Sequence, residues 1–495
     1  MKLTLGILSV LALAELPAYA HIGRALQVPT TGDLAAEFSV SGRRQHLHAR
    51  ASPKNAADMA KIQDSSQECQ EYGYPASQAL SKKYPGYHIA SLVDGDDQAQ
   101  QVWSEVQQSG IIPSDIQPRG ATKGHYGISD DSSNSYNNDK DPDCWWTATG
   151  CTSPKHPKIG DDMTSCPEPN TWGLTFDDGP NCSHNAFYDY LSKNKLKATM
   201  FFIGTNVMDL PFQAQRALAD GHDICLHTWS HRYMTTLSNE QVFSELYYTM
   251  RIIKDIVGVT PRCWRPPYGD VDDRVRAIAA GLGLRTIIWS HDTDDWNIIP
   301  DGTQPTSKID SNYQKIIDKQ TQNKLDGKGV NVLTHELTDN TMGEFQKEFP
   351  KIKEAFANVV PLTACFNVTQ PYAESQYKYP IFADFIKGNI SPQGVPSLDQ
   401  MPQINVSSKI DVTPEKQQTG AGGFSSASKP VDETTESDDA DMSSSKSSNS
   451  SASSSSSNAA TQGSSKNADS DSSAASIPLY MSGMLAPILL SFAML

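Results

Sequence analysis

Short apolar runs alternate with amphipathic segments between about residues 171 and 366, and this alternation is the strongest pattern in the chain. Seven runs are short and apolar enough to be strands, at 172–176, 199–203, 224–226, 263–264, 285–289, 330–333 and 362–365. The segments between them repeat apolar residues every three or four positions, as in Val242, Leu246, Met250, Ile253 and Val257. Repeated strand–helix alternation predicts an α/β fold with a parallel sheet that closes into a barrel.

The chain on either side of this region is polar and weakly periodic. Residues 21–165 contain a Ser/Asn/Asp stretch at 130–143, so we expect a poorly structured N-terminal region whose role stays unassigned. Its Trp145-Trp146 pair and nearby cysteines indicate a small ordered unit, a flap over the main domain, or a partly cleaved pro-segment. Residues 369–412 form a C-terminal extension. Serine dominates 413–476 with almost no apolar residues, which predicts a disordered stalk.

Both ends of the chain are apolar. A lysine at position 2, an apolar run at 3–14 and an Ala-x-Ala sequence ending at Ala20 are typical of a signal peptide spanning 1–20. Residues 477–495 carry no charge and follow a polar spacer and small residues, which is the pattern of a removed GPI-attachment signal. A tail-anchored helix is the alternative. We therefore expect export to the cell surface, with a GPI lipid anchor in the plasma membrane and contact with the cell wall.

Composition narrows the partners and the compartment. The net charge of −16 argues against nucleic acid, because an acidic protein gains no counterion-release energy on a phosphate backbone. Eight cysteines, none in a C-x-x-C pattern, suggest disulfides in an exported chain. Five N-glycosylation sequons agree with secretion, at Asn181, Asn367, Asn389, Asn405 and Asn449. We expect a monomer.

Two adjacent carboxylates follow the first apolar run. Asp177 and Asp178 precede Gly179-Pro180, which favours a turn. Successive side chains on a strand point to opposite faces, so a strand that ends here leaves both acids usable at its mouth. The alternative is a solvated Asp-Asp turn, which is common.

Two histidines follow the third apolar run. His227 and His231 are four positions apart, so they can share one face of a helical turn and ligate a single cation. Thr228 stands where the H-E-x-x-H motif of zinc proteases places its glutamate base. A base must therefore come from elsewhere, and Asp177 or Asp178 can supply it.

Three further polar clusters follow later runs. They are Arg-Pro-Pro-Tyr-Gly-Asp at 265–270, an acidic and aromatic segment at 289–296, and Leu-Thr-His-Glu at 333–336. Gly269 permits an unusual dihedral that can aim a backbone N–H at a ligand. Five polar clusters, all at the C-terminal ends of strands, match the place where barrel enzymes build their active sites.

Together the motifs Thr-Phe-Asp-Asp-Gly-Pro, His-Thr-x-x-His, Arg-Pro-Pro-Tyr-Gly, Asp-x-x-Asp-Trp and Leu-x-His resemble those of the NodB-type polysaccharide deacetylases, carbohydrate esterase family 4, over residues 166–368. The layout with a Ser-rich, lipid-anchored tail is similar to the fungal chitin deacetylases of that family. The resemblance implies a distorted (β/α)7–8 barrel. It also implies metal-dependent hydrolysis of N-acetyl groups in chitin, a polymer of N-acetylglucosamine, giving chitosan and acetate.

The resemblance assigns a role to each motif. It implies that one divalent metal, Zn²⁺ or Co²⁺, is held by Asp178, His227 and His231. Asp177 would be the general base and Arg265 would orient it.

The remaining motif residues would complete the site around the acetyl group. His335 would be the general acid, held by Asp295. The Tyr268 backbone N–H would stabilise the oxyanion, and Trp289 and Leu333 would wall the pocket for the acetyl methyl group.

Some residues near the motifs keep open interpretations. Cys225 is either free or paired, and a disulfide between Cys166 and Cys365, which bracket the domain, is one possibility. Asp292 and Glu336 either support the site or are simply solvated.

Two other functions stay open. An O-deacetylase of acetylated xylan would share all five motifs, because the hydrolytic groups meet only an acetyl carbonyl. A catalytically inactive wall mannoprotein that binds glycans would lack a metal ligand or the base, and this chain lacks neither.

Overall fold

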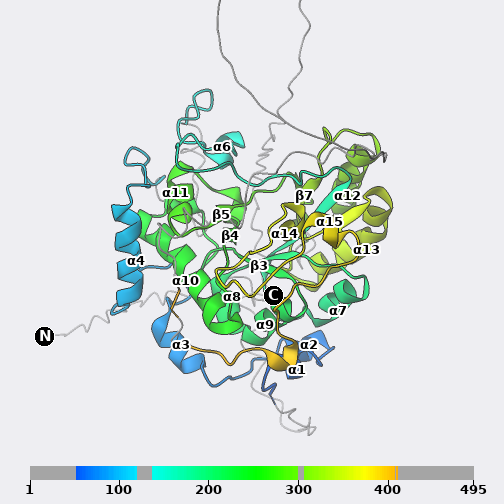
Figure 1. The fold of residues 1–495 in the computed structure, drawn as a ribbon, viewed down its shortest axis with the longest axis horizontal. Helices are drawn as coiled ribbons and strands as arrows, with labels where there is room; N and C mark the ends of the chain where they lie inside the picture. Colours follow the sequence, from blue (N-terminus) through cyan, green and yellow to red (C-terminus); the bar gives the residue numbers. More distant parts are fainter. Residues whose placement is uncertain (1–51, 120–135, 299–305, 407–408, 411–495) are drawn as a thin grey trace, which may run out of the picture. The chain divides into compact units, whose positions relative to one another are not determined.

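The computed structural model describes residues 52–119, 136–298, 306–406 and 409–410 (Figure 1). At its centre is a parallel sheet of eight strands in the order β5-β4-β3-β2-β1-β7-β6, with β8 paired to β1. The strands are β1 (Thr171–Gly179), β2 (Thr199–Phe202), β3 (Asp223–Leu226), β4 (Cys263–Trp264), β5 (Arg285–Thr286), β6 (His291–Asp292), β7 (Val330–Leu333) and β8 (Asn358–Val360). The predicted α/β class with a parallel sheet is confirmed. The predicted signal peptide, Ser-rich stalk and apolar C-terminal segment lie outside the described residues.

The first and last strands of the sheet, β5 and β6, are close together in the sequence. β5 pairs with β4, and β6 pairs with β7. Residues 287–290 join them, and they bond to both sides. The Ile287 N–H donates to the Trp264 carbonyl at 3.0 Å, and the Ser290 N–H donates to the Asn331 carbonyl at 2.8 Å. Segment 285–292 is therefore the irregular wall of a distorted, curled barrel.

Two predicted strands differ from the structure. Residues 362–365 form a helix, α14 (Leu362–Cys365), and the strand is the preceding β8. A run of four residues is too short to show whether its period is that of a helix or a strand. Pro361, which caps this helix, was the available sign of a helix start. Residues 285–289 were predicted as one strand, but only 285–286 pair as β5, while the short polar β6 was missed.

Helices surround the sheet. They are α1 (Ala56–Met59), α2 (Ser65–Glu68), α3 (Ser77–Lys83), α4 (Asp97–Gln108), α6 (Trp146–Thr149), α7 (Asn185–Lys193), α8 (Gly204–Asp209), α9 (Pro211–Ala219), α10 (Asn239–Val257), α11 (Asp273–Gly281), α12 (Thr306–Thr321), α13 (Asp339–Ala355), α14 and α15 (Phe382–Phe385), with 3₁₀ turns η2 (Met234–Thr236), η3 (Pro267–Gly269), η4 (Asp295–Asn297) and η5 (Leu398–Gln400). None of these helices is long and apolar enough to cross a membrane.

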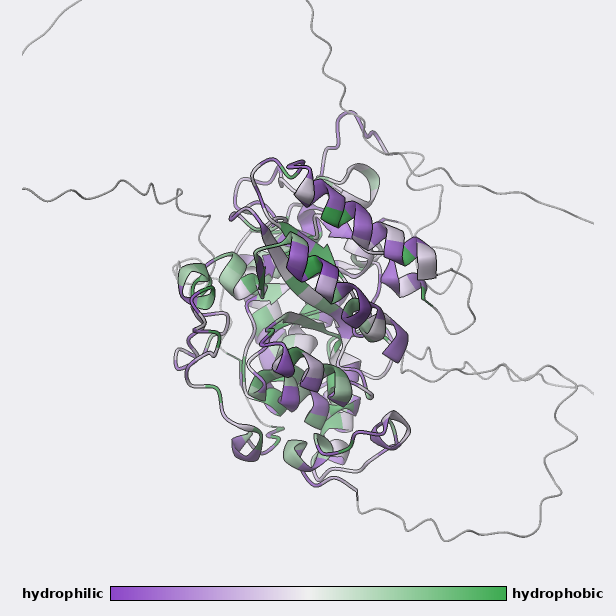
Figure 2. Cartoon of the chain, turned by 90° about the vertical axis from the view of Figure 1, so that its right-hand side faces the viewer, coloured by the Kyte–Doolittle hydropathy of each residue, from purple (hydrophilic) through white to green (hydrophobic). Residues whose placement is uncertain are grey.

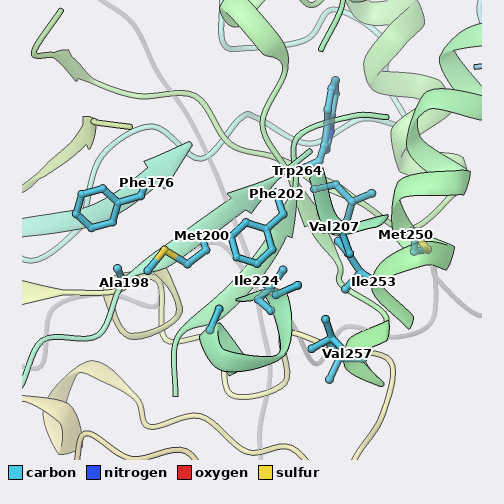
Figure 3. Packing of buried hydrophobic residues seen from close by; sticks show 14 of the residues in the cluster. Phe176, Ala198, Met200, Phe202, Val207, Ile224, Met250, Ile253, Val257 and Trp264 are labelled. Carbon is cyan, nitrogen blue, oxygen red and sulfur yellow. The ribbon is translucent and has the colours of Figure 1, made fainter. Parts of the chain in front are cut away.

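The outward face of the strands packs on these helices. Helix α10 begins at a capping box between Ser238 and Gln241 and ends at Gly258, whose φ is 92°. Its apolar stripe meets alternate strand residues, including Phe202 and Ile224, as Figure 3 shows. Hydrophobic residues accordingly concentrate in the strands, and hydrophilic ones colour much of the surrounding helices (Figure 2).

The N-terminal region is better ordered than the sequence indicated. Residues 52–119 contain α1 to α4, and α4 lies alongside α10 (Figure 1). Trp103 of α4 packs on Phe243 with ring centroids 5.0 Å apart. The buried residues of α4 are Ala99, Val102, Trp103 and Val106. This is the spacing of one helix face, so the helix was predictable from the sequence.

All eight cysteines are paired. The disulfides are Cys69–Cys182, Cys144–Cys151, Cys166–Cys365 and Cys225–Cys263. The possible bridge across the ends of the barrel is confirmed, and Cys225 is not a free thiol. Cys69–Cys182 links the N-terminal region covalently to the segment that follows β1.

Candidate active site

The first strand runs through both adjacent acids instead of ending before them. Asp177 pairs with Phe201 and Gly179 with Phe202, so Asp178 is the extra residue of a bulge. Its φ of 70° lies in the left-handed region that non-glycine residues rarely adopt. Both carboxylates reach the same histidine, since Asp177 Oδ2 is 3.8 Å and Asp178 Oδ1 is 3.4 Å from His227 Nε2. The predicted strand end is wrong, but the bulge brings both acids to one mouth.

Asp178, His227 and His231 bring three ligand atoms together. Asp178 Oδ1 lies 3.4 Å from His227 Nε2 and 3.1 Å from His231 Nε2. Tetrahedral metal bonds of ~2.1 Å would separate ligand atoms by about 3.4 Å. Asp178 Oδ1 is buried and forms no well-aligned hydrogen bond at these distances. The donor set therefore fits a divalent cation, which would satisfy this oxygen.

The second ring nitrogen of each histidine is also held. His227 Nδ1 lies 2.8 Å from the Arg265 carbonyl. A carbonyl only accepts hydrogen bonds, so Nδ1 carries the proton and Nε2 keeps the lone pair that a metal needs. His231 Nδ1 is 3.1 Å from the Tyr268 hydroxyl. The two histidines belong to a loop and not to the helical turn expected from their spacing, because Thr228 and His231 have φ of 65° and 54°.

The N-terminal region supports this histidine loop. Trp229 stacks on Tyr84 with ring centroids 5.6 Å apart, and its Nε1 donates to the Gly86 carbonyl at 2.9 Å. Glu245 of α10 is fully buried and accepts hydrogen bonds from the backbone and side chain of Ser230 at 2.8 and 2.6 Å. No motif in the sequence indicates these contacts, because they join residues that are not neighbours in the chain.

Asp177 is paired with a fully buried arginine. Arg265 Nη1 donates to Asp177 Oδ1 at 2.7 Å and to the Thr175 hydroxyl at 2.9 Å. Its Nη2 donates to Asn331 Oδ1 at 3.0 Å. Burial lowers the pKa of Arg265 below its ordinary value, although the Asp177 carboxylate acts in the opposite direction. Asn331 was missed, and its only signal is a polar residue inside the apolar run of β7.

His335 is held by Asp295 on the neighbouring strand end. His335 Nδ1 lies 2.6 Å from Asp295 Oδ1, and its backbone N–H donates to Asp295 Oδ2 at 2.9 Å. Burial lowers the pKa of His335, but the carboxylates of Asp295, Asp178 and Asp177 together outweigh it and raise that pKa to about 10. His335 also pairs through its backbone with Asp177, so the expected acid and base are neighbours.

The expected pocket residues lie around the same point. Tyr268 and Gly269 have φ of 58° and 69°, which gives the Arg-Pro-Pro-Tyr-Gly loop its sharp turn. Trp289 is half-buried, and its ring lies 5.9 Å from the Arg265 guanidinium. Leu333 is buried at the end of β7, two residues before His335.

Glu336 is fully buried and not solvated. It accepts hydrogen bonds from the Asn181 N–H at 2.9 Å and the Tyr188 hydroxyl at 2.8 Å, and it contacts His184 Nδ1 at 2.7 Å. It therefore fixes the loop after the two acids. Asp292 is partly exposed and flanks the site, and burial raises its pKa to about 6.

The predicted glycan at Asn181 is wrong for the folded protein. Asn181 is only 6% exposed, and its side-chain nitrogen donates to the Leu337 carbonyl at 2.6 Å. A glycan needs that nitrogen at the surface. Asn367, Asn389 and Asn405 are exposed, whereas Asn449 lies outside the described residues.

Comparisons with known proteins place these motifs in context. Residues 164–287 match the family described as polysaccharide deacetylase. The chain is 49% identical over 349 residues to chitin deacetylase 2 of Cryptococcus neoformans var. grubii, covering 69% of this chain and 75% of the relative. It is 53% identical over 239 residues to chitin deacetylase of Amylomyces rouxii, covering 48% and 56%. The solved chitin deacetylase of Colletotrichum lindemuthianum is 25% identical with a TM-score of 0.38, covering 42% of this chain and 92% of that chain.

Proposed function

Because the chain belongs to the polysaccharide deacetylase family, we propose that it hydrolyses the N-acetyl groups of N-acetylglucosamine units in chitin, giving chitosan and acetate in the fungal cell wall. The relatives named chitin deacetylases support this substrate. The observation that carries the reaction is that a three-ligand cluster, an Asp177–Arg265 pair and a His335–Asp295 pair share one mouth.

Buried acidic and histidine side chains activate the attacking water. Asp178, His227 and His231 would hold the metal, Zn²⁺ or Co²⁺, which when bound polarises the acetyl carbonyl and lowers the pKa of water from about 15.7 towards about 7. Asp177 takes the proton from the attacking water. The Arg265 hydrogen bond to Asp177 Oδ1 holds that carboxylate in position and leaves Oδ2 to face the site.

The acid side protonates the leaving nitrogen. An amine leaves poorly unless it is protonated, so His335 donates its proton to the amide nitrogen as the tetrahedral carbon collapses. Asp295 keeps His335 charged until then. The Tyr268 N–H stabilises the developing oxyanion, which typically contributes about 2.7–4 kcal/mol. Trp289 and Leu333 enclose the methyl group.

Acetate release from defined chitin oligomers tests the proposal. The wild-type protein, reloaded with Zn²⁺ or Co²⁺ after chelation, should release acetate, and Asp177→Asn should lower the rate by about 10²–10⁴-fold. Asp318→Asn, an exposed carboxylate on α12, is the matched control and should leave the rate unchanged. Equal yield from Asp177→Asn would show that the assigned base is wrong.

The same assay separates the alternatives. Acetate released from acetylated xylan and not from chitin oligomers would indicate the O-deacetylase. Glycan binding without acetate release from either substrate would indicate an inactive wall mannoprotein.

We also propose that the protein is exported and lipid-anchored, with the signal peptide at 1–20 and GPI attachment within 464–473. Four disulfides agree with an oxidising compartment. Phosphatidylinositol-specific phospholipase C should release the protein from cells, and size measurement should give a monomer. Peptide mapping should locate glycans at Asn367, Asn389, Asn405 and Asn449.

A further inference from the structure

A turn closed by the Cys144–Cys151 disulfide carries Trp146 to the rim of the site. The Trp146 N–H donates to the Val271 carbonyl at 3.0 Å. A Cβ added to Gly269 would lie 2.2 Å from Trp146 Cζ3, so the indole packs directly on this glycine. Gly269 follows Tyr268, whose N–H we assign to the oxyanion. Trp146 therefore covers the loop that carries this donor.

The same indole also contacts the expected wall of the acetyl pocket. Trp146 and Trp289 meet edge to face, with ring centroids 4.9 Å apart and planes at 65°. Both side chains are half-buried. The Trp289 ring in turn lies 5.9 Å from the Arg265 guanidinium. A row of aromatic surface thus leads away from the catalytic groups and ends at Trp146.

The frame that presents Trp146 is rigid and is built by its neighbours. The buried Arg276 donates to the Cys144 and Cys151 carbonyls at 2.6 and 2.9 Å. Trp145 Nε1 donates to Asp270 Oδ1 at 2.9 Å. These bonds fix the turn without using the Trp146 side chain, so the frame does not account for an indole at that position.

We infer that Trp146 is a substrate-contacting, specificity-determining residue whose partly exposed ring stacks on a sugar next to the one being deacetylated. A pyranose presents an apolar face of C–H groups, and a fixed indole covers it with little loss of conformational entropy. Trp146 contacts Trp289, which in turn lies 5.9 Å from the Arg265 guanidinium, so we expect the contact beside the sugar that is deacetylated. Trp146 also lies outside the matched residues 164–287, so the region before the barrel supplies it.

The inference rests on the proposed function and is tested by substrate length. For Trp146→Ala, kcat/KM on a chitin pentamer should fall by about tenfold through KM, as expected for a lost contact of this size. Hydrolysis of a small aryl acetate ester should stay within about twofold, because that substrate has no neighbouring sugar. Trp146→Phe should retain most of the pentamer rate. Tyr87→Ala, an exposed aromatic whose hydroxyl contacts Asp209, is the matched control and should leave both substrates unaffected.

Three outcomes would overturn the inference. The ester and pentamer rates would fall together if Trp146 only holds Gly269 and Trp289 in place. No loss on any oligomer would exclude a sugar contact, and so would a loss that is equal for monomer and pentamer.

A binding measurement keeps the inference distinct from the proposed function. Pentamer binding is measured by calorimetry in the Asp177→Asn background, with and without Trp146→Ala. Weaker binding of the double variant supports the contact even if the wild type releases no acetate. If the pentamer binds equally well to both, or to neither, the contact is excluded.

Discussion

The two faces of the sheet use the same strands for different purposes. Side chains that point outward, such as Phe176, Met200 and Ile224, pack against the surrounding helices and are fully buried among apolar groups. Phe176, for example, contacts Phe187 of α7 and Phe345 of α13. Side chains that point inward near the strand ends are charged or polar and equally buried, as are Asp177 and Arg265. Because side chains alternate along a strand, one sequence run serves both faces. The outer face stabilises the fold, and the inner face performs the chemistry.

A disulfide stabilises the inner face, where charged side chains are buried. Burying ions costs several kcal/mol each, which polar pairing repays only in part. Cys225 and Cys263 form a disulfide, and each lies two residues before a site residue, His227 and Arg265. Two residues on a strand share a face, so this bridge lies directly behind the site. Its closed loop of 38 residues is typically worth about 4 kcal/mol.

Replacing a metal ligand should have the largest effect of these changes. It should lower the rate of acetate release and leave the stability that the outer face provides unchanged. Asp178→Asn should lower acetate release by about 10³-fold, because a bound metal contributes several kcal/mol to the transition state. In chelator, its free energy of unfolding should match the wild type within about 1 kcal/mol, because the variant removes a buried oxygen with no well-aligned donor. Metal content and chemical denaturation measure the two effects. A variant that keeps both metal and rate would contradict the ligand assignment.

A cavity on the outer face should reverse this pattern. Ile253→Ala, on the sheet-facing side of α10, should lower the free energy of unfolding by about 2–5 kcal/mol while the folded fraction keeps its rate. Ile386→Ala, at a side chain that is 48% exposed, is the control and should change stability by less than about 0.5 kcal/mol. A large loss of rate per folded molecule would mean that the two faces are coupled.

Arg265→Lys should lower both the rate and the stability, because Arg265 holds the base and also satisfies buried polar groups. Lysine cannot reach Asp177, Thr175 and Asn331 together, so stability should fall by about 1–3 kcal/mol. The rate should fall by about 10²-fold as Asp177 loses its orientation. Arg285→Lys, at a partly exposed arginine of β5, is the control and should leave the rate unchanged. An unchanged rate would remove Arg265 from the mechanism.

The smallest expected effect is a shift of pH dependence. His335 acts in its protonated form, so activity is lost as pH rises through its pKa, which Asp295, Asp178 and Asp177 together raise to about 10. Asp295→Asn removes the first-ranked of these carboxylates, while the burial that lowers the pKa stays. The alkaline limb of kcat/KM should therefore move to lower pH by at least about one unit. A limb that stays in place would show that another group controls it.

The sequence predicted the fold class and the main site because polar residues at strand ends stand out against apolar runs. Asp177, His227, Arg265 and His335 were all visible in this way. The bulge at Asp178 was not, because it depends on pairing with β2. Asn331 and Glu336 were missed or left open because a buried polar residue looks like any other polar letter until its partners are known.

Apart from Cys166–Cys365, the disulfide partners were beyond reach for a related reason, as was the contact of Tyr84 with Trp229. They join distant segments, and one sequence does not encode which cysteines meet. The folded part of the N-terminal region was readable in α4, where the apolar spacing was present but overlooked.

The Cys69–Cys182 bridge gives this region a particular relation to proteolysis. Its two ends are 113 residues apart in sequence, yet they are joined two residues beyond Pro180. A protease that cuts once between residues 70 and 181 severs the chain but releases nothing, since the fragments stay tied through sulfur. Such a cut would leave two chains joined by one disulfide, and they would separate under denaturing conditions only after reduction.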